Sequence, residues 1–256
     1  MQTGAITEYI DVAQLVLYAF WIFFAGLIYY LHQENKREGY PLESSVSGRT
    51  DIVGFPPLPS PKTFRLADGS SVTVPRTVEP ASDIDATAVG GYPGAPIEPN
   101  GSGMGAGVGP GAYAQRRDIP DLTIDGEPRI VPLRAAAGFE VSARDTDPRG
   151  LPVVGSDMVV GGVVSDVWVD RSEVLFRYLE VKVEGAGGRG TVLLPVNFSR
   201  IGGRRVVVDS IMGRDFAKVP QTRNADVVTL LEEERVMAYY GGGTLYADPR
   251  RAEPLL

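Results

Sequence analysis

The chain contains no cysteine and only one histidine, His32, among its 256 residues. The absence of cysteine excludes disulfides, thiolate metal sites and cysteine nucleophiles. A single histidine also removes the usual general base and most transition-metal sites from the soluble part. No P-loop, dinucleotide-binding fingerprint or metal-ligand spacing is present in the sequence. These absences argue against a catalytic protein.

Acidic residues outnumber basic ones, 32 to 25, which gives a formal net charge of −7, and no Lys or Arg precedes Lys36. A general nucleic-acid binder would present a basic face, so nucleic acid is not an expected partner. The length suits one membrane anchor followed by one modest soluble domain.

Residues 12–31 form an apolar run whose only strongly polar member is Gln14. A helix of this length reaches roughly 30 Å, the thickness of a bilayer core. Because no basic residues precede it and no cleavage site follows it, we predict an anchor that is retained. Lys36 and Arg37 follow the run, so residues 1–11 are predicted to lie in the periplasm and the body in the cytoplasm.

Three residues suggest that this helix packs against other protein helices. Ala19 and Gly26 are seven residues apart and share a face, and Trp21 falls near mid-bilayer. The alternative is a plain lipid-facing anchor. His32 lies at the cytoplasmic end, where its ring can reach headgroups and water. A chlorophyll ligand would instead lie inside the span.

Residues 32–118 are predicted to be an extended Pro/Gly-rich strap on a membrane-facing partner surface. Eleven of the 20 prolines fall between 41 and 118, so this segment cannot form its own core. A free linker is the alternative. Residues 64–75 predict a small hairpin that turns at Asp68-Gly69. The run "GSGMGAGVGPG" (101–111) resembles a phosphate loop only superficially, because no strand precedes it and no helix follows.

Residues 119–256 are predicted to form a mainly β cytoplasmic domain with one late helix. Segments rich in β-branched residues predict strands and a small, closed or nearly closed barrel. Thr229 and Glu232 have the spacing of a capping box, and the glycines at 241–243 are expected to end that helix. The strand segments are 158–170, 174–183, 191–196 and 204–211.

Carboxylates are concentrated in this domain. Seven lie between Asp118 and Asp147 against three arginines, and Asp170 and Glu173 follow. One interpretation is a solvated acidic surface that keeps the protein soluble. The other is a proton-collecting surface, because clustered carboxylates raise one another's affinity for protons.

An ordered series of motifs over essentially the whole chain resembles the H subunit of the purple-bacterial photosynthetic reaction centre. The motifs are "FWIFFAGLIYYLHQENKREGYPLE", "PKTF", "GVGP", "RRDIPDL", "AAAGFEVSA", "GLPV", "VWVD", "YLEV", "TLLEEE" and "LYA". The resemblance implies a PRC-barrel domain and a non-catalytic, single-pass subunit of the bacterial inner (intracytoplasmic photosynthetic) membrane. It would cap the cytoplasmic face of the L and M subunits, stabilise the complex and support proton transfer to the reduced secondary quinone.

The resemblance also implies partners and cofactors. The expected partners are L, M, membrane lipids, a core light-harvesting ring and a cytochrome subunit. No cofactor or metal is expected on this chain. Bacteriochlorophyll, bacteriopheophytin, quinones, non-haem iron and carotenoid would belong to L and M.

Several residues acquire expected roles from the same resemblance. Glu173 matches the family's internal proton-chain glutamate, and Asp170 and Arg177 match neighbouring positions. Asp125 and Glu127 stand where relatives have a histidine pair, and carboxylates have lower proton affinity near neutral pH. The expected proton-transfer set is Glu173, Asp170, Arg177, Asp125, Glu127, Asp121 and Asp118.

Two other classes of protein stay open. A membrane-tethered PRC-barrel adaptor for unrelated partners would not need the strap. A hydrolytic enzyme would need a nucleophile and a base that the sequence does not supply.

Overall fold

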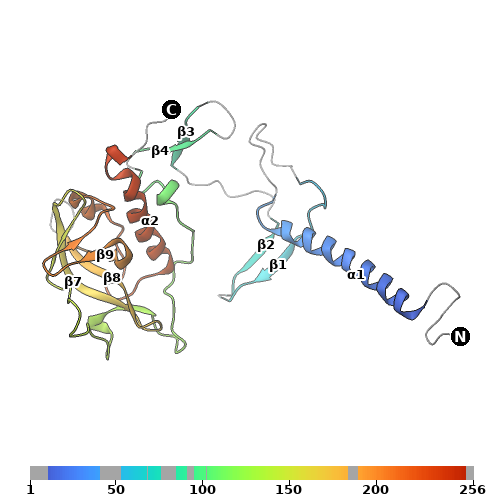
Figure 1. The fold of residues 1–256 in the computed structure, drawn as a ribbon, viewed down its shortest axis with the longest axis horizontal. Helices are drawn as coiled ribbons and strands as arrows, with labels where there is room; N and C mark the ends of the chain where they lie inside the picture. Colours follow the sequence, from blue (N-terminus) through green and yellow to red (C-terminus); the bar gives the residue numbers. More distant parts are fainter. Residues whose placement is uncertain are drawn as a thin grey trace. The chain divides into compact units, whose positions relative to one another are not determined.

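A computed structural model describes residues 11–40, 53–67, 69–75, 85–90, 95–101, 103–183 and 190–251. The chain divides into two compact units (Figure 1). The first comprises Met1–Ser82 with Tyr92–Gly94, and the second comprises Asp83–Gly91 with Ala95–Leu256. The expected boundary between strap and β domain at residue 118 stays a prediction.

The first unit contains the long apolar helix α1, Val12–Glu34. The Asp11 side chain caps its start by accepting a hydrogen bond of 2.7 Å from the Gln14 amide. No residue of this helix is buried within the structure, and it is long and apolar enough to cross a membrane. The predicted anchor is therefore present as a single exposed apolar helix.

The two basic residues after α1 are buried, which the sequence did not indicate. Lys36 Nζ donates to the carbonyl oxygens of Val53 and Pro56, both at 2.6 Å. Arg37 is held by the Glu34 carboxylate at 2.5 Å and by the Ser60 carbonyl oxygen. These bonds fix the chain where it leaves the helix, so both cations stabilise local structure as well as adding positive charge.

The predicted hairpin follows this junction and is confirmed. Strand β1 (Lys62–Arg65) pairs antiparallel with β2 (Ser71–Val74), with Phe64 opposite Val72. Gly69 has a φ of 83°, a conformation that glycine adopts without strain. Asp68, the other predicted turn residue, lies outside the described residues.

The second unit is built on a seven-stranded, mainly antiparallel sheet with the order β10-β11-β6-β7-β8-β9, in which β5 also pairs with β7. The strands are β5 (Ile130–Pro132), β6 (Pro152–Val154), β7 (Val160–Asp170), β8 (Leu175–Val183), β9 (Gly190–Pro195), β10 (Arg200–Ile201) and β11 (Val206–Val207). The four predicted strand segments all contain strands, but only Val206–Val207 is a strand within 204–211. The expected barrel is not closed by hydrogen bonds, because β9 and β10 end the sheet without pairing to each other.

Short elements complete the described chain. Strands β3 (Ala86–Ala88) and β4 (Ile97–Pro99) form a separate hairpin. The 3-10 helices are η1 (Asn35–Arg37), η2 (Gly109–Gly111), η3 (Leu133–Ala135), η4 (Val196–Phe198), η5 (Gly213–Lys218) and η6 (Pro249–Arg251). The core of the second unit is centred on Trp168, Tyr240 and Phe216, none more than 1 % exposed.

Helix α2, Leu230–Tyr246, lies along this sheet (Figure 1). The predicted capping box is confirmed: the Thr229 hydroxyl accepts from the Glu232 amide, and the Glu232 carboxylate accepts from the Thr229 amide. The predicted stop at residues 241–243 is wrong, because the helix continues through these glycines to Tyr246.

These glycines lie within the helix, and their lack of a side chain lets neighbouring backbone pack closely against it. A β-carbon at Gly241 would come within 2.5 Å of the Pro110 carbonyl oxygen. One at Gly242 would lie 3.1 Å from the Met104 α-carbon. The run 101–111, interpreted as low complexity, therefore packs here, and its Met104 and Val108 are buried.

Replacing Gly241 with alanine should destabilise the protein, although alanine is the better helix former by about 1 kcal/mol. The added methyl group collides with the Pro110 carbonyl oxygen, and overpacking of this kind typically costs about 1–3 kcal/mol. Gly105→Ala is the control, because nothing lies within 4 Å of the added carbon. Denaturant unfolding of the full chain in detergent measures both. A Gly241→Ala protein as stable as Gly105→Ala would contradict this packing.

Candidate functional site

The site begins with the turn that joins β7 to β8. Asp170 ends β7, and its Oδ1 accepts hydrogen bonds from the backbone amides of Ser172 at 2.9 Å and Glu173 at 3.0 Å. The Val174 amide donates to the Asp170 carbonyl oxygen at 2.8 Å. A short acidic side chain that bonds to the amides just ahead of it favours a turn. Asp170 thus shapes the turn that carries Glu173.

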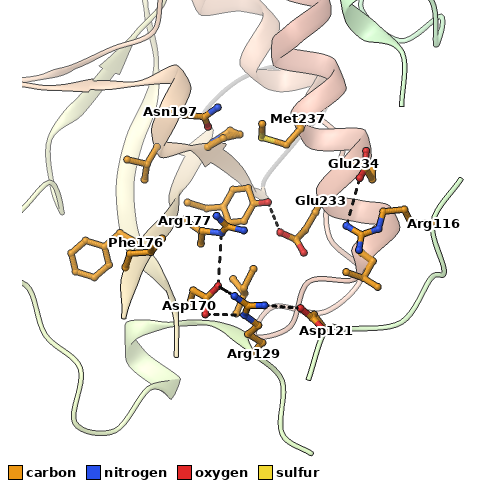
Figure 2. A pocket seen from close by; sticks show the side chains of 16 residues that line it. Arg116, Asp121, Arg129, Asp170, Phe176, Arg177, Asn197, Glu233, Glu234 and Met237 are labelled. Carbon is orange, nitrogen blue, oxygen red and sulfur yellow. Dashed lines mark hydrogen bonds and ion pairs between the residues drawn. The ribbon is translucent and has the colours of Figure 1, made fainter. Parts of the chain in front are cut away.

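Arg129 is brought beside this turn by strand pairing. Strand β5 pairs antiparallel with β7, with Ile130 opposite Asp170, so Arg129 lies next to the Asp170 carboxylate. Its Nε donates to Oδ1 at 3.0 Å and its Nη2 lies 2.9 Å from Oδ2. The same guanidinium also contacts Asp121 at 3.2 Å and the Glu173 carboxylate. Figure 2 shows Arg129 between Asp170 and Asp121.

The electrostatics keep Asp170 ionised. Its side chain has no exposed surface, and burial by itself raises the pKa of this carboxyl. The Arg129 hydrogen bond and the amides of Glu173 and Ser172 lower the pKa further than burial raises it, so the net pKa lies below the usual value. Arg177 Nε adds positive charge 4.0 Å from Oδ2.

Exposure changes stepwise across the four residues that we call the Arg129 cluster: Arg129, Asp121, Asp170 and Glu173. The side chains of Asp121 and Glu173 are 43 % and 48 % exposed, that of Arg129 is 24 % exposed, and that of Asp170 is fully buried. The cluster therefore connects two carboxylates that are exposed to water with one that is not.

The remaining carboxylates of the predicted set lie outside this cluster. Glu127 pairs with Arg171 at 2.8 Å on the neighbouring turn, and Asp125 is exposed near the tip of the loop between Thr123 and Glu127. Asp118 pairs with Arg223 at 2.6 Å and accepts the Thr229 hydroxyl at 2.7 Å. The structure thus brings together Asp121, Asp170, Glu173 and Arg177, but places Asp118 at the start of α2.

A groove of about 820 Å³ opens beside the Arg129 cluster (Figure 2). Two lining residues that the sequence analysis did not single out are Tyr178 on β8 and Glu233 on α2. The Tyr178 hydroxyl donates to Glu233 Oε2 at 2.7 Å. One signal could have indicated Glu233: in "TLLEEE" the cap uses Glu232, which leaves the next glutamate free for another role. Arg129 could have been noticed as a cation inside an acidic stretch.

The predicted helix-packing residues are all available on the surface of α1. Ala19, Trp21 and Gly26 are exposed, and nothing lies within 4 Å of a β-carbon built at Gly26. Their role in packing stays a prediction. Within the described residues there is no group of three or more His, Cys, Asp or Glu side chains that could hold a metal ion.

The described residues comprise one exposed helix that is long and apolar enough to cross a membrane, and a small, mainly β domain that carries the Arg129 cluster. Residues 140–214 match the PRC-barrel domain. Residues 4–135, more than half of the chain, match the N-terminal region of the photosynthetic reaction centre H-chain. The chain belongs to the reaction centre H-chain family, which associates with the reaction centre complex of photosynthesis.

Proposed function

We propose that the chain caps the cytoplasmic face of the L and M subunits and delivers protons to the reduced secondary quinone. In this role it is a non-catalytic subunit of a light-driven electron-transfer complex. Bacteriochlorophyll, bacteriopheophytin, carotenoid, quinones and non-haem iron belong, in this proposal, to L and M. The light-harvesting ring, the cytochrome subunit and membrane lipids remain proposed neighbours.

The single observation that carries the proton proposal is the Arg129 cluster. A fully buried, ionised Asp170 holds Arg129, and Arg129 in turn holds the half-exposed Asp121 and Glu173. A proton carrier must bind and release its proton repeatedly, which requires contact with both water and the next acceptor. Glu173 is 48 % exposed to water and contacts Arg129, and Asp170 fixes the turn that holds it, which supports this role. Flash spectroscopy of a Glu173 variant, argued in the Discussion, tests this proposal.

We also propose that the exposed outer residues collect protons for this cluster. Glu127 is 64 % exposed and Asp125 is exposed, so both can take protons directly from water. Arg171, which lies on the same turn as Glu173, forms an ion pair with Glu127 at 2.8 Å. Asp118 is tied to Arg223 and Thr229, and is therefore assigned a smaller part in collection.

The proposed topology has a direct test. If the N-terminus is periplasmic, protease added to the cytoplasmic side of sealed membrane vesicles should remove the body of the chain. The physical reason is that Lys36 and Arg37 follow the apolar helix, whereas the residues before the helix include neither Lys nor Arg. Vesicles sealed in the opposite orientation are the control. Protection on the cytoplasmic side, with digestion from the other side, would reverse the orientation and contradict the proposed capping role.

A further inference from the structure

The groove beside the Arg129 cluster is large enough to hold several water molecules, because one water occupies about 30 Å³ of liquid volume. Its volume is about 820 Å³, and its walls come from α2, β8, the segment that precedes β5, the end of β7 and the junction of β9 with η4. Asp170, Arg129 and Asp121 line one part, and Glu233 lines another (Figure 2). The groove therefore joins Glu233 to the Arg129 cluster through space that water can fill.

Glu233 is positioned in this groove by the start of α2. Glu232 turns back to cap the helix, while the Glu233 side chain points into the groove, where the Tyr178 hydroxyl donates to it at 2.7 Å (Figure 2). Tyr178 is 4 % exposed, so its hydroxyl needs a partner inside the protein. This contact fixes the orientation of the Glu233 carboxyl.

Charged groups face Glu233 from each neighbouring element. Strand β8 contributes Arg177, the segment before β5 contributes Arg116 and Asp121, and α2 itself contributes Glu234. Arg116 lies 3.6 Å from Glu234, so its charge is shared between the two glutamates. Glu233 has no ion pair within 4 Å among the described residues. By contrast, Asp170, Glu173 and Asp121 each form an ion pair with Arg129.

The balance of these effects favours the protonated form of Glu233 more than in water. Burial raises its pKa; the Tyr178 hydrogen bond, Arg177 and Arg116 lower it by less, and Asp121 raises it. Burial also raises the pKa of the Tyr178 hydroxyl far above its ordinary range, so tyrosine stays a donor and does not give up its proton. The group in this pair that exchanges a proton is the carboxyl.

We propose that Glu233 is a proton-exchanging carboxyl of the groove, which takes a proton from groove water and returns it toward the Arg129 cluster. The carboxylate gains the proton that a water-borne hydronium releases, and the carboxylate re-forms when that proton passes through water to the Glu173 side. No electron is transferred in either step. This inference rests on the proposed function, because it adds a member to the same proton path.

The test uses the intact reaction centre complex carrying Glu233→Gln, with Glu234→Gln as the matched control. Glu234 is adjacent on the same helix and pairs with Arg116 at 3.6 Å. Flash-induced proton uptake is followed with a pH indicator across the pH range. We expect Glu233→Gln to lose one titrating step above the usual carboxyl range, and to slow the second electron transfer to the quinone. Glu234→Gln should keep both.

Two further variants separate proton exchange from a structural role. Tyr178→Phe removes a hydrogen bond that lowers the Glu233 pKa, so the titrating step should move to higher pH rather than disappear. Glu233→Asp should restore a step, because it returns a carboxyl to the groove. An infrared carbonyl band of a protonated carboxyl should be lost only in Glu233→Gln. A structural role would move none of these signals.

The possible failures are distinguishable. If Glu233→Gln leaves the uptake curve and the infrared band unchanged while Glu173→Gln slows proton-coupled transfer, the role of Glu233 is overturned and the proposed function stands. If neither variant alters uptake or transfer, the proposed function fails together with this inference. If both glutamine variants at 233 and 234 lose the same step, the assignment to Glu233 is also overturned.

Discussion

Replacing Arg129 with leucine should lower the free energy of unfolding at neutral pH by about 3 kcal/mol, because removing one partner of a buried ion pair leaves the other charge uncompensated. Asp170 has no exposed surface and depends on two contacts from this guanidinium, at 3.0 and 2.9 Å. The amides of Ser172 and Glu173 still bond Oδ1 in the variant, so part of the compensation remains. Denaturant unfolding of the full chain in detergent measures the loss.

The pH dependence of the free energy of unfolding provides a second, independent test of this prediction. In the wild type the pKa of Asp170 is lowered on folding, so its stabilisation is present above the unfolded pKa and is lost as the pH falls through the folded pKa. Without Arg129 the effect of burial is opposed only by the remaining amides and charges, so the pKa of Asp170 should be higher than in the wild type and acidification relieves the buried charge sooner. The stability difference between wild type and Arg129→Leu should therefore shrink as the solution is made acidic.

A surface arginine provides the control for this experiment. Arg200 is 71 % exposed and pairs with Asp209, which is 62 % exposed, at 2.7 Å. Ion pairs of this kind are typically worth less than about 1 kcal/mol, so Arg200→Leu should change stability little at any pH. The double variant Arg129→Leu/Asp170→Asn should recover part of the loss, because it removes the buried charge. Equal losses for the two single leucine variants would contradict the structural role of Arg129.

The elements that the sequence predicted are those whose signals are local. The apolar run before Lys36, the spacing of Thr229 and Glu232, and the β-branched segment ending at Asp170 each determine structure from neighbouring residues. The mistaken helix end at residues 241–243 has the opposite cause. Glycine ends helices on local grounds, but here contacts with Pro110 and Met104 keep these residues helical.

The candidate site was only partly predictable, because its contacts are distant in sequence. Arg129 meets Asp170 through the pairing of β5 with β7, which no local pattern specifies. The same limit applies to Arg134, which contacts the buried Asp166 at 3.1 Å and the buried Glu180 at 2.8 Å. Strand β8 buries Glu180 as well as its neighbours Leu179 and Val181, and no local pattern indicates that this carboxylate would be buried.

The family resemblance supplied what local patterns could not. It drew attention to Glu173, Asp170 and Arg177, which lie within one charged region of the structure. It did not indicate Arg129, the residue that joins Glu173 to Asp170, nor the Tyr178–Glu233 pair. Strand register and side-chain burial were needed to find these, since both depend on the whole fold.

Glu173→Gln should slow the proton-coupled second electron transfer to the quinone by about a hundredfold, the lower end of what a positioned proton carrier contributes. Glutamine keeps the shape of the side chain and can still accept a hydrogen bond from Arg129 through its amide oxygen, but it cannot take up and release the proton. Primary charge separation should be unchanged in the same samples, which makes it an internal control for assembly. Flash spectroscopy on the purified complex measures both steps.

Substitution of the outer carboxylates, Asp125 and Glu127, provides a comparison for the effect of Glu173→Gln. Asp125→Asn combined with Glu127→Gln should produce a milder, pH-dependent slowing, because Asp121 remains half-exposed on Arg129 and can still collect protons. Glu127 also contacts a different arginine, Arg171, so its loss leaves the Arg129 cluster intact. The order of effects is therefore Glu173 first and the outer pair second. Unaltered second-transfer kinetics in Glu173→Gln from acidic to alkaline pH would leave these carboxylates as a solvated acidic surface, and would remove proton delivery from the function of this chain.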